Sequence, residues 1–172
     1  MSTATDSQEI TLRQPTAEDG APLHALVREC KPLDENSVDC NLLQCTHFAD
    51  TCIVAEKGGR LVGFVTGYRM PRDPSIYFLW QVGVAAAGRG HGLGRRMIQA
   101  VLTRESCRGV TELNTTITRS NTASRALFAA VAEAEGARMS EHEYFTAEHF
   151  GGAGHEAEYL FRIAPLSSPP QG

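Results

Sequence analysis

The sequence lacks most of the features that mark specialised protein classes. It carries a net charge of −4 and 7% aromatic residues, so it offers neither the surplus of Lys and Arg nor the aromatic side chains with which proteins bind nucleic acid. No apolar run approaches the length that crosses a bilayer, and the first residues, MSTATDSQE, lack the charged and apolar regions of a signal peptide. We therefore expect a cytoplasmic protein that binds neither nucleic acid nor membrane.

Cysteines are few and irregularly spaced. They are odd in number and include no CxxC pair, so neither a disulfide framework nor a zinc site is indicated, and we expect no metal; they are Cys30, Cys40, Cys45, Cys52 and Cys107. A length of 172 residues suits one domain with one buried core. We expect this domain at residues 10–164, between a disordered head at residues 1–9 and a disordered tail at residues 165–172.

What the sequence does contain is an alternation of strand and helix patterns. Helical spacing of apolar residues predicts helices after Thr16, after Asn36 or Ser37, at 93–102 and at 121–134. Apolar, β-branched segments predict strands at 9–16, 52–56, 61–69, 76–84, 110–118 and 156–163, with a hairpin at Gly58 and Gly59 and a loop at 70–75. The fold class is therefore mixed α/β, with 76–84 as a buried central strand.

The segment GRGHGLGRRM, Gly88 to Met97, combines bare backbone with positive charge between a strand and a helix. This arrangement is a general recipe for binding phosphate. A Walker A loop is excluded because Arg95 and Arg96 follow Gly94, and the Rossmann spacing is excluded because Leu93 or Arg95 stands in its sixth position. The remaining pattern is R-x-x-G-x-G. A glycine-rich connection without any ligand is the alternative.

The segment VGVAAAGRGHGLGRRMIQAVL resembles the acetyl-CoA binding segment of the GNAT acetyltransferase superfamily, and SNTASRALF follows where that superfamily has a further helix. The resemblance implies a mixed, mostly antiparallel central sheet flanked by helices, with acetyl-CoA as cosubstrate. It implies that strand groups of Val82 and Val84 contact the pantetheine arm, and that Asn121 and Ser124 belong to the cofactor site. The amide of Asn121 contacts the arm, caps the following helix, or does both. It also implies that the turn holds the pyrophosphate through Arg89, Gly90, His91, Gly92, Leu93 and Gly94.

Other segments resemble one family within this superfamily, the diaminobutyrate acetyltransferases of ectoine biosynthesis. They are CKPLDENS, LLQCTHFADT, WQVGV, TTITRSNTASRALF and FGGAGHEAEYLFRI, and the similarity runs from about Thr11 to Ile163. This resemblance implies transfer of acetyl to the 4-amino group of L-2,4-diaminobutyrate, and a homodimer. Another small amine is the alternative acceptor.

The acceptor carries two ammonium groups and one carboxylate, so its site needs carboxylates toward the amines. The resemblance places candidate substrate-binding residues at Asp34, Asn36, Asp39, Trp80, Gln81 and Thr115. Because an ammonium must lose a proton before it attacks, a general base is required, and the candidates are Glu158 and His155. Trp80 is an equally good core residue, and His155 an equally good residue of a surface loop. A backbone N–H near Val82 would stabilise the oxyanion.

Two positions depart from the family pattern. Phe128 stands where many superfamily members have a Tyr that protonates the leaving thiolate, and Asp39 stands where the diaminobutyrate enzymes favour a Tyr. These departures keep open a module that binds acyl-CoA without turnover. A cysteine nucleophile is disfavoured, because none of the cysteines has a partner base nearby in the sequence.

Overall fold

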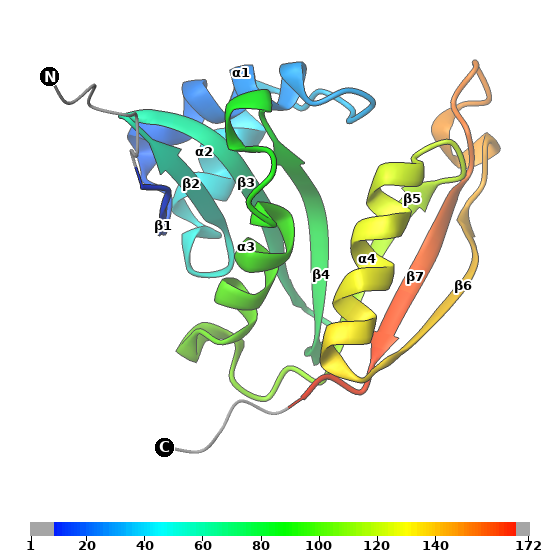
Figure 1. Ribbon diagram of the computed structural model, residues 1–172. Coiled ribbons are helices and arrows are strands. Elements are labelled where there is room, and N and C mark those ends of the chain that lie inside the picture. The colour runs from blue at the N-terminus through cyan, green and yellow to red at the C-terminus, as the bar shows by residue number, and fades with distance from the viewer. Residues whose placement is uncertain (1–8, 168–172) are drawn as a thin grey trace, which may run out of the picture.

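The computed structural model describes residues 9–167, which form one seven-stranded sheet with helices on both faces (Figure 1). The sheet order is β1-β2-β3-β4-β5-β7-β6, and β4 and β5 are the parallel pair within this otherwise antiparallel sheet. The strands are β1 (Thr11–Arg13), β2 (Ile53–Lys57), β3 (Arg60–Met70), β4 (Asp73–Val84), β5 (Glu112–Thr118), β6 (Arg138–Phe145) and β7 (Glu158–Ala164). The predicted fold class is confirmed.

Four helices cover the sheet, two on each face. In the view of Figure 1, α3 and α4 lie in front of the sheet and α1 and α2 lie behind it. The helices are α1 (Gly20–Glu29), α2 (Val38–Thr46), α3 (Leu93–Leu102) and α4 (Thr122–Glu135). Ser37 caps α2, since its hydroxyl accepts from the N–H of Cys40 at 3.0 Å. None of the helices in the described part of the chain has the length and apolar character that a membrane crossing requires.

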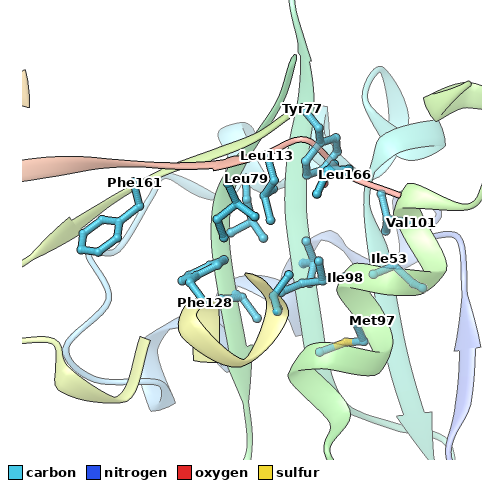
Figure 2. Packing of buried hydrophobic residues seen from close by; sticks show 14 of the residues in the cluster. Ile53, Tyr77, Leu79, Met97, Ile98, Val101, Leu113, Phe128, Phe161 and Leu166 are labelled. Atoms are coloured by element: carbon cyan, nitrogen blue, oxygen red, sulfur yellow. The ribbon is translucent and has the colours of Figure 1, made fainter. Parts of the chain in front are cut away.

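Alternation along the strands builds two hydrophobic clusters, one on each face. Ile53 of β2 joins the cluster beneath α3 and α4, while its neighbour Val54 joins the cluster beneath α1 and α2. Figure 2 shows the larger cluster, where Met97 and Ile98 of α3 and Phe128 of α4 pack on the sheet. Burial of each such side chain contributes about 1.5–3 kcal/mol, so this cluster fixes both helices against the strands.

The central strands β4 and β5 separate part-way along their length. Their parallel pairing runs from Ile76 opposite Glu112 to Leu79 opposite Thr115, and β4 then continues to Val84 beside β3 alone. The sheet is thereby divided into two arms, the β1–β4 arm and the β5–β7 arm, the latter made of β5, β7 and β6. Backbone groups of β4 beyond Leu79 have no strand partner on the β5 side.

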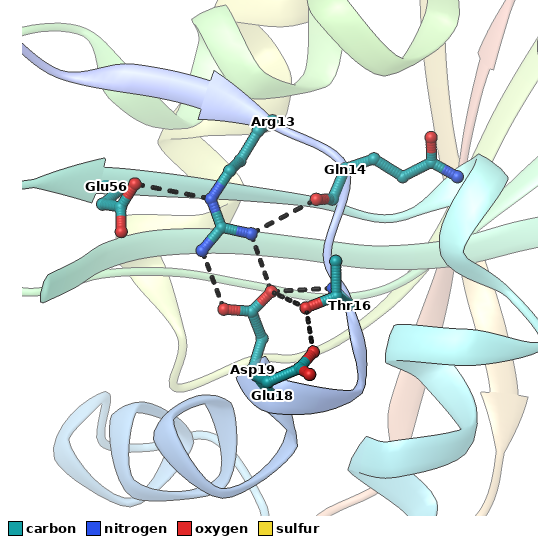
Figure 3. A network of polar contacts seen from close by, with 6 residues as sticks. All are labelled: Arg13, Gln14, Thr16, Glu18, Asp19 and Glu56. Carbon is teal, nitrogen blue, oxygen red and sulfur yellow. Dashed lines mark hydrogen bonds and ion pairs between the residues drawn. The ribbon is translucent and has the colours of Figure 1, made fainter. Parts of the chain in front are cut away.

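A polar network joins β1, the 3-10 turn Ala17–Asp19 and β2 (Figure 3). Arg13 donates two hydrogen bonds to the carboxylate of Asp19, at 2.7 and 2.8 Å, and also pairs with Glu56 at 3.4 Å. Asp19 is 5% exposed and accepts in addition from the backbone N–H of Thr16 at 2.7 Å. The bond from Arg13 is the main reason that the pKa of Asp19 lies below its ordinary value.

The structure differs from the sequence-based expectations in three places. The loop expected at 70–75 is a tight connection, because β3 ends at Met70 and β4 already begins at Asp73. Strand β6 was not predicted, since nearly all its side chains are exposed and no apolar alternation marks it. The predicted head and tail fall mainly on residues 1–8 and 168–172, outside the described residues, but Leu166 is buried and its N–H donates to Thr111.

Candidate active site

The turn between β4 and α3 presents bare main chain, as its sequence predicts. Gly90 and Gly92 have φ angles of +85° and +61°, in the left-handed region that glycine alone adopts freely. Gly92 is also the N-cap of α3. The first N–H groups of a helix have no acceptor within it and carry partial positive charge. The turn therefore gathers free donors at one point.

Positive and apolar side chains surround these donors. A cavity of about 360 Å³ is lined by the turn, by Arg89 and Arg95, and by Leu127 and Ala130 of α4. Within residues 9–167, neither arginine forms an ion pair with a carboxylate. The cavity thus suits a ligand that carries anionic groups at the turn and an apolar part against α4.

The free edge of β4 leads from this turn to the centre of the sheet. The N–H of Ala85 donates to the carbonyl of Val62 on β3 at 2.8 Å. Because N–H and C=O groups alternate between the two edges of a strand, those of Val82 and Val84 point to the opposite edge, where β5 has diverged. These two residues can therefore form hydrogen bonds with an extended ligand, as they would with a neighbouring strand.

A second, polar cavity of about 490 Å³ lies between the two arms of the sheet. Its lining includes the carboxylates of Asp34, Glu156 and Glu158 and the ring of His155, and it contains no Lys or Arg. Three carboxylates against one imidazolium give a formal net charge of −2. Aromatic rings from both arms complete the wall, namely Tyr68, Phe78, Trp80, Phe145 and Phe150. The cavity therefore favours a small cation with an apolar stem.

His155 is held between two acceptors. Its Nδ1 lies 2.6 Å from the backbone carbonyl of Glu156, and its Nε2 lies 3.1 Å from Oδ2 of Asp34. Both ring nitrogens face acceptors, so this arrangement favours the imidazolium form of the ring. The bond to Asp34, and next the bond to Glu156, raises the pKa of His155 above its ordinary value. Phe150 stacks on the ring with centroids 3.8 Å apart. An imidazolium has no lone pair with which to act as a base.

Glu158 is the other predicted base, and its carboxylate acts as a hydrogen-bond acceptor in the structure. It begins β7 opposite Thr118, and its Oε1 accepts from the hydroxyl of Thr116 at 2.9 Å. Side-chain ligand atoms of Asp34, His155 and Glu158 lie within 4.8 Å of one another. Residue types of this kind can hold a metal ion when the histidine is neutral. With His155 donating from both nitrogens, the carboxylates of Asp34 and Glu158 remain as acceptors for the N–H donors of an alkyl ammonium. The net negative charge of the cavity suits either cation.

The structure brings together most of the predicted residues, but the side chains of Thr115, Asp39, Ser124 and His91 line neither cavity. Asp34, Asn36, Trp80, Gln81 and Asn121 line the polar cavity together with both predicted bases. Thr115 is 3% exposed and its hydroxyl donates to the carbonyl of Leu79, while Thr116 lines the cavity in its place. Asp39 is exposed in the first turn of α2, and Ser124 donates its N–H to the side chain of Asn121.

Sequence reasoning missed several residues of the cavity wall, among them Thr116, Phe150 and Tyr68. Thr116 supports Glu158, Phe150 stacks on His155, and Tyr68 lies beside Trp80 with ring centroids 6.1 Å apart. Tyr68 stands opposite Phe78 in the antiparallel pairing of β3 and β4. The aromatic residues at alternating positions Tyr68, Phe78 and Trp80 would have been the available signal, because side chains on one face of paired strands meet.

Neither a thiol nor a phenol of the core supplies an alternative catalyst. Burial raises the pKa of Cys45 to about 11 and that of Cys52 to about 12, so both remain neutral thiols near pH 7. No cysteine lines the polar cavity. Phe128 is 1% exposed and packs in the core. These observations disfavour a mechanism with a cysteine nucleophile.

Comparison with known proteins identifies the family to which this chain belongs. Residues 20–132 match the acetyltransferase (GNAT) family. The L-2,4-diaminobutyric acid acetyltransferase of Bordetella parapertussis is 49% identical over 160 residues, which are 92% of this chain and 86% of that protein. The protein of the same name from Vibrio cholerae is 46% identical over 157 residues, 91% of this chain and 90% of that one.

Solved structures agree with these matches. The diaminobutyrate acetyltransferase of Paenibacillus lautus, in complex with its substrate L-2,4-diaminobutyric acid and coenzyme A, is 37% identical, with a TM-score of 0.90. That match covers 96% of this chain and all of the other. An acetyltransferase of Thermus thermophilus, 16% identical with a TM-score of 0.61 over 91% of this chain and 97% of its own, shares the fold.

Proposed function

The chain belongs to the acetyltransferase (GNAT) family and, within it, to the L-2,4-diaminobutyric acid acetyltransferases, and from this membership we propose that it acetylates L-2,4-diaminobutyrate with acetyl-CoA. The product is N4-acetyl-2,4-diaminobutyrate, in ectoine biosynthesis. The observation that carries the proposal is the acidic cavity between the two arms, next to the free edge of β4. The Paenibacillus lautus relative, solved with this amino acid and coenzyme A, supports it.

Acetyl-CoA occupies the turn and the free strand edge in this proposal. The pyrophosphate accepts from the N–H groups between Arg89 and Gly94, and the pantetheine arm pairs with Val82 and Val84. Asn121, which lines the polar cavity, lies where the arm enters it. The thioester is thereby delivered to the point at which β4 and β5 part.

The amine enters from the acidic cavity. An alkyl ammonium has a pKa near 10, so only about one molecule in a thousand is nucleophilic at neutral pH. The charge of the cavity draws the substrate in through its ammonium groups, with Asp34 as an anchor. Glu158 takes one proton from the 4-ammonium, because both nitrogens of His155 face acceptors and favour its protonated form. The substrate thereby gains a neutral nitrogen beside the thioester.

Acetyl transfer then forms a carbon–nitrogen bond and breaks a carbon–sulfur bond. The neutral nitrogen attacks the thioester carbonyl carbon, and the oxyanion that forms accepts from a backbone N–H of β4 near Val82. The carbon–sulfur bond breaks as the oxyanion collapses, and the second amine proton is lost to water, or to Glu158 after it has passed its first proton to solvent. The CoA thiolate has a pKa of about 8.5 by the cysteine reference and leaves without the phenol that Phe128 replaces.

The direct test measures CoA thiol release from acetyl-CoA with four amines, L-2,4-diaminobutyrate, ornithine, lysine and putrescine. The proposal requires diaminobutyrate to give the highest kcat/KM. Equal values for all four amines would contradict the substrate assignment. Stabilisation by acetyl-CoA without thiol release from any amine would identify a binding module instead.

Location and assembly follow as secondary proposals. All five cysteines are free thiols, which supports a reducing cytoplasm, where acetyl-CoA is also found. We propose a homodimer, supported by the apolar side chains that α2 leaves exposed, Val38, Leu42 and Leu43. Light scattering coupled to size exclusion tests it, and a monomer mass would contradict it.

A further inference from the structure

The loop between α1 and α2, residues 30–37, carries Asp34 into the amine cavity without helical or strand structure of its own over most of its length. One side chain of the central strand fastens it. Gln81 of β4 is 8% exposed, its Oε1 accepts from Nδ2 of Asn36 at 2.9 Å, and its Nε2 donates to the backbone carbonyl of Asp34 at 2.8 Å.

These two bonds fix the orientation of the Gln81 amide. A reversed amide would set its oxygen against the carbonyl of Asp34 and its nitrogen against the amide nitrogen of Asn36. Both the oxygen and the nitrogen of the buried Gln81 amide are therefore paired with groups of the loop. Loss of either partner would leave a polar group buried without its bond, which is the costly outcome for an interior amide.

The fastened loop reaches across to the other arm of the sheet. The side chain of Asp34 accepts from His155, which precedes β7, and Phe150 stacks on the far side of that ring. Gln81 thus holds the backbone of a residue whose carboxylate bridges the β1–β4 arm to the β5–β7 arm. The bridge crosses the polar cavity, since all four of these residues line it.

We infer that Gln81 is a positioning residue for amine recognition: it holds the loop on β4 so that the carboxylate of Asp34 meets His155 above the amine cavity. The inference rests on the proposed function for the identity of the amine. It replaces the expectation that Gln81 itself contacts the substrate with an indirect role through Asp34.

Steady-state kinetics give the first test. Gln81→Met keeps the length of the side chain and removes both bonds, and we expect KM for diaminobutyrate to rise about tenfold, with kcat and KM for acetyl-CoA changed less than twofold. Asn36→Ala is expected to raise the same KM by a smaller factor. The double variant should match Gln81→Met alone, because both substitutions break one connection.

A histidine titration followed by NMR gives the second test and needs no substrate. The signal of His155 is identified by its loss in His155→Gln. Pairing with Asp34 raises the pKa of His155, so Asp34→Asn should lower it, and Gln81→Met should lower it in the same direction by releasing the loop. This result is independent of which amine the enzyme accepts, so a failure of the proposed substrate leaves it intact.

Thr66→Val is the matched control, because Thr66 stands opposite Gln81 in the pairing of β3 and β4 and is 2% exposed. Its hydroxyl has no hydrogen-bond partner among residues 9–167, so both tests should be unaffected. A Gln81→Met enzyme with raised KM but an unchanged His155 titration would overturn the inference in favour of direct contact. Equal losses in both KM values and in kcat would overturn it in favour of general destabilisation.

Discussion

The glycine turn and the amine cavity are two binding regions built in opposite ways. The turn uses main chain from one uninterrupted segment, and its donors are set by the positive φ angles of Gly90 and Gly92. The cavity uses side chains from five separate parts of the chain, and its lining residues extend from Pro32 to Glu158. The turn is determined by one local segment of the sequence, whereas the cavity forms only after the two arms of the sheet have folded against each other.

This difference indicates which substrate each region binds. A main-chain site recognises a group that many enzymes share, the phosphates of a nucleotide cosubstrate, and tolerates variation in side chains. A side-chain site selects one acceptor by charge and shape, and a change in any segment alters it. We therefore expect substitutions in the turn to affect acetyl-CoA and substitutions in the cavity to affect the amine.

The largest effect is expected from Glu158→Gln. The amide keeps the shape and can still accept from Thr116, but it cannot take a proton, so kcat should fall about 10²- to 10⁴-fold. Binding of acetyl-CoA, measured by calorimetry, should remain within twofold of the original. A kcat reduced less than threefold would show that Glu158 is not the base. The cavity would then be a binding region for the amine without an identified catalytic residue.

Gly92→Val should have the next largest effect, on the other region. A branched side chain at a φ of +61° strains the turn and obstructs approach to its N–H groups, so the apparent affinity for acetyl-CoA should fall at least about tenfold. Gly59→Val is the control, since Gly59 also has a positive φ of +77° and open space around it but lies in the β2–β3 hairpin. Equal weakening of acetyl-CoA binding in both variants would remove the turn from the site.

Asp19→Ala should leave both regions intact while lowering stability. It breaks the buried pair with Arg13, at an expected cost of about 2 kcal/mol, or a fall of about 4–8 °C in Tm. Both KM values should stay within twofold of the original at 25 °C. A selective change in one of them would mean that the first turn of the chain is coupled to that site.

The smallest effect is expected from Asp34→Asn on stability. The pKa of His155 is raised in the folded protein, so this pair contributes fully below pH 6.5 and its contribution is lost as pH rises through the raised value. Because the pair is largely exposed, the fall in Tm should be about 1–2 °C at pH 6 and should vanish at alkaline pH. A deficit that grows with pH would contradict the imidazolium assignment.

The turn, the surrounding helices and most strands follow from the sequence because each is a local pattern. Gly88 to Gly94 predicts a turn by composition, and the buried faces of α3 and α4 repeat at helical spacing. Strand β6 escapes prediction because its exposed side chains leave no alternation to detect. The order of the strands, and with it the parting of β4 from β5, depends on contacts between distant segments.

The cavity was predicted only in part, for the same reason. Asp34, His155 and Glu158, which family resemblance predicts as site residues, line one cavity, but the protonation of His155 depends on the acceptors that the fold places beside it. The burial of Thr115 and the half-buried position of Thr116 depend on which face of β5 meets the helices. A single sequence contains no direct signal for either.

A crystal structure of the wild-type protein with coenzyme A and L-2,4-diaminobutyrate tests the central claim most directly. The account predicts the pyrophosphate on the N–H groups of Arg89 to Gly94 and the 4-amino group within hydrogen-bond distance of Glu158. A pyrophosphate bound away from this turn, or a diaminobutyrate whose 4-amino group lies outside the cavity between the two arms, would contradict it.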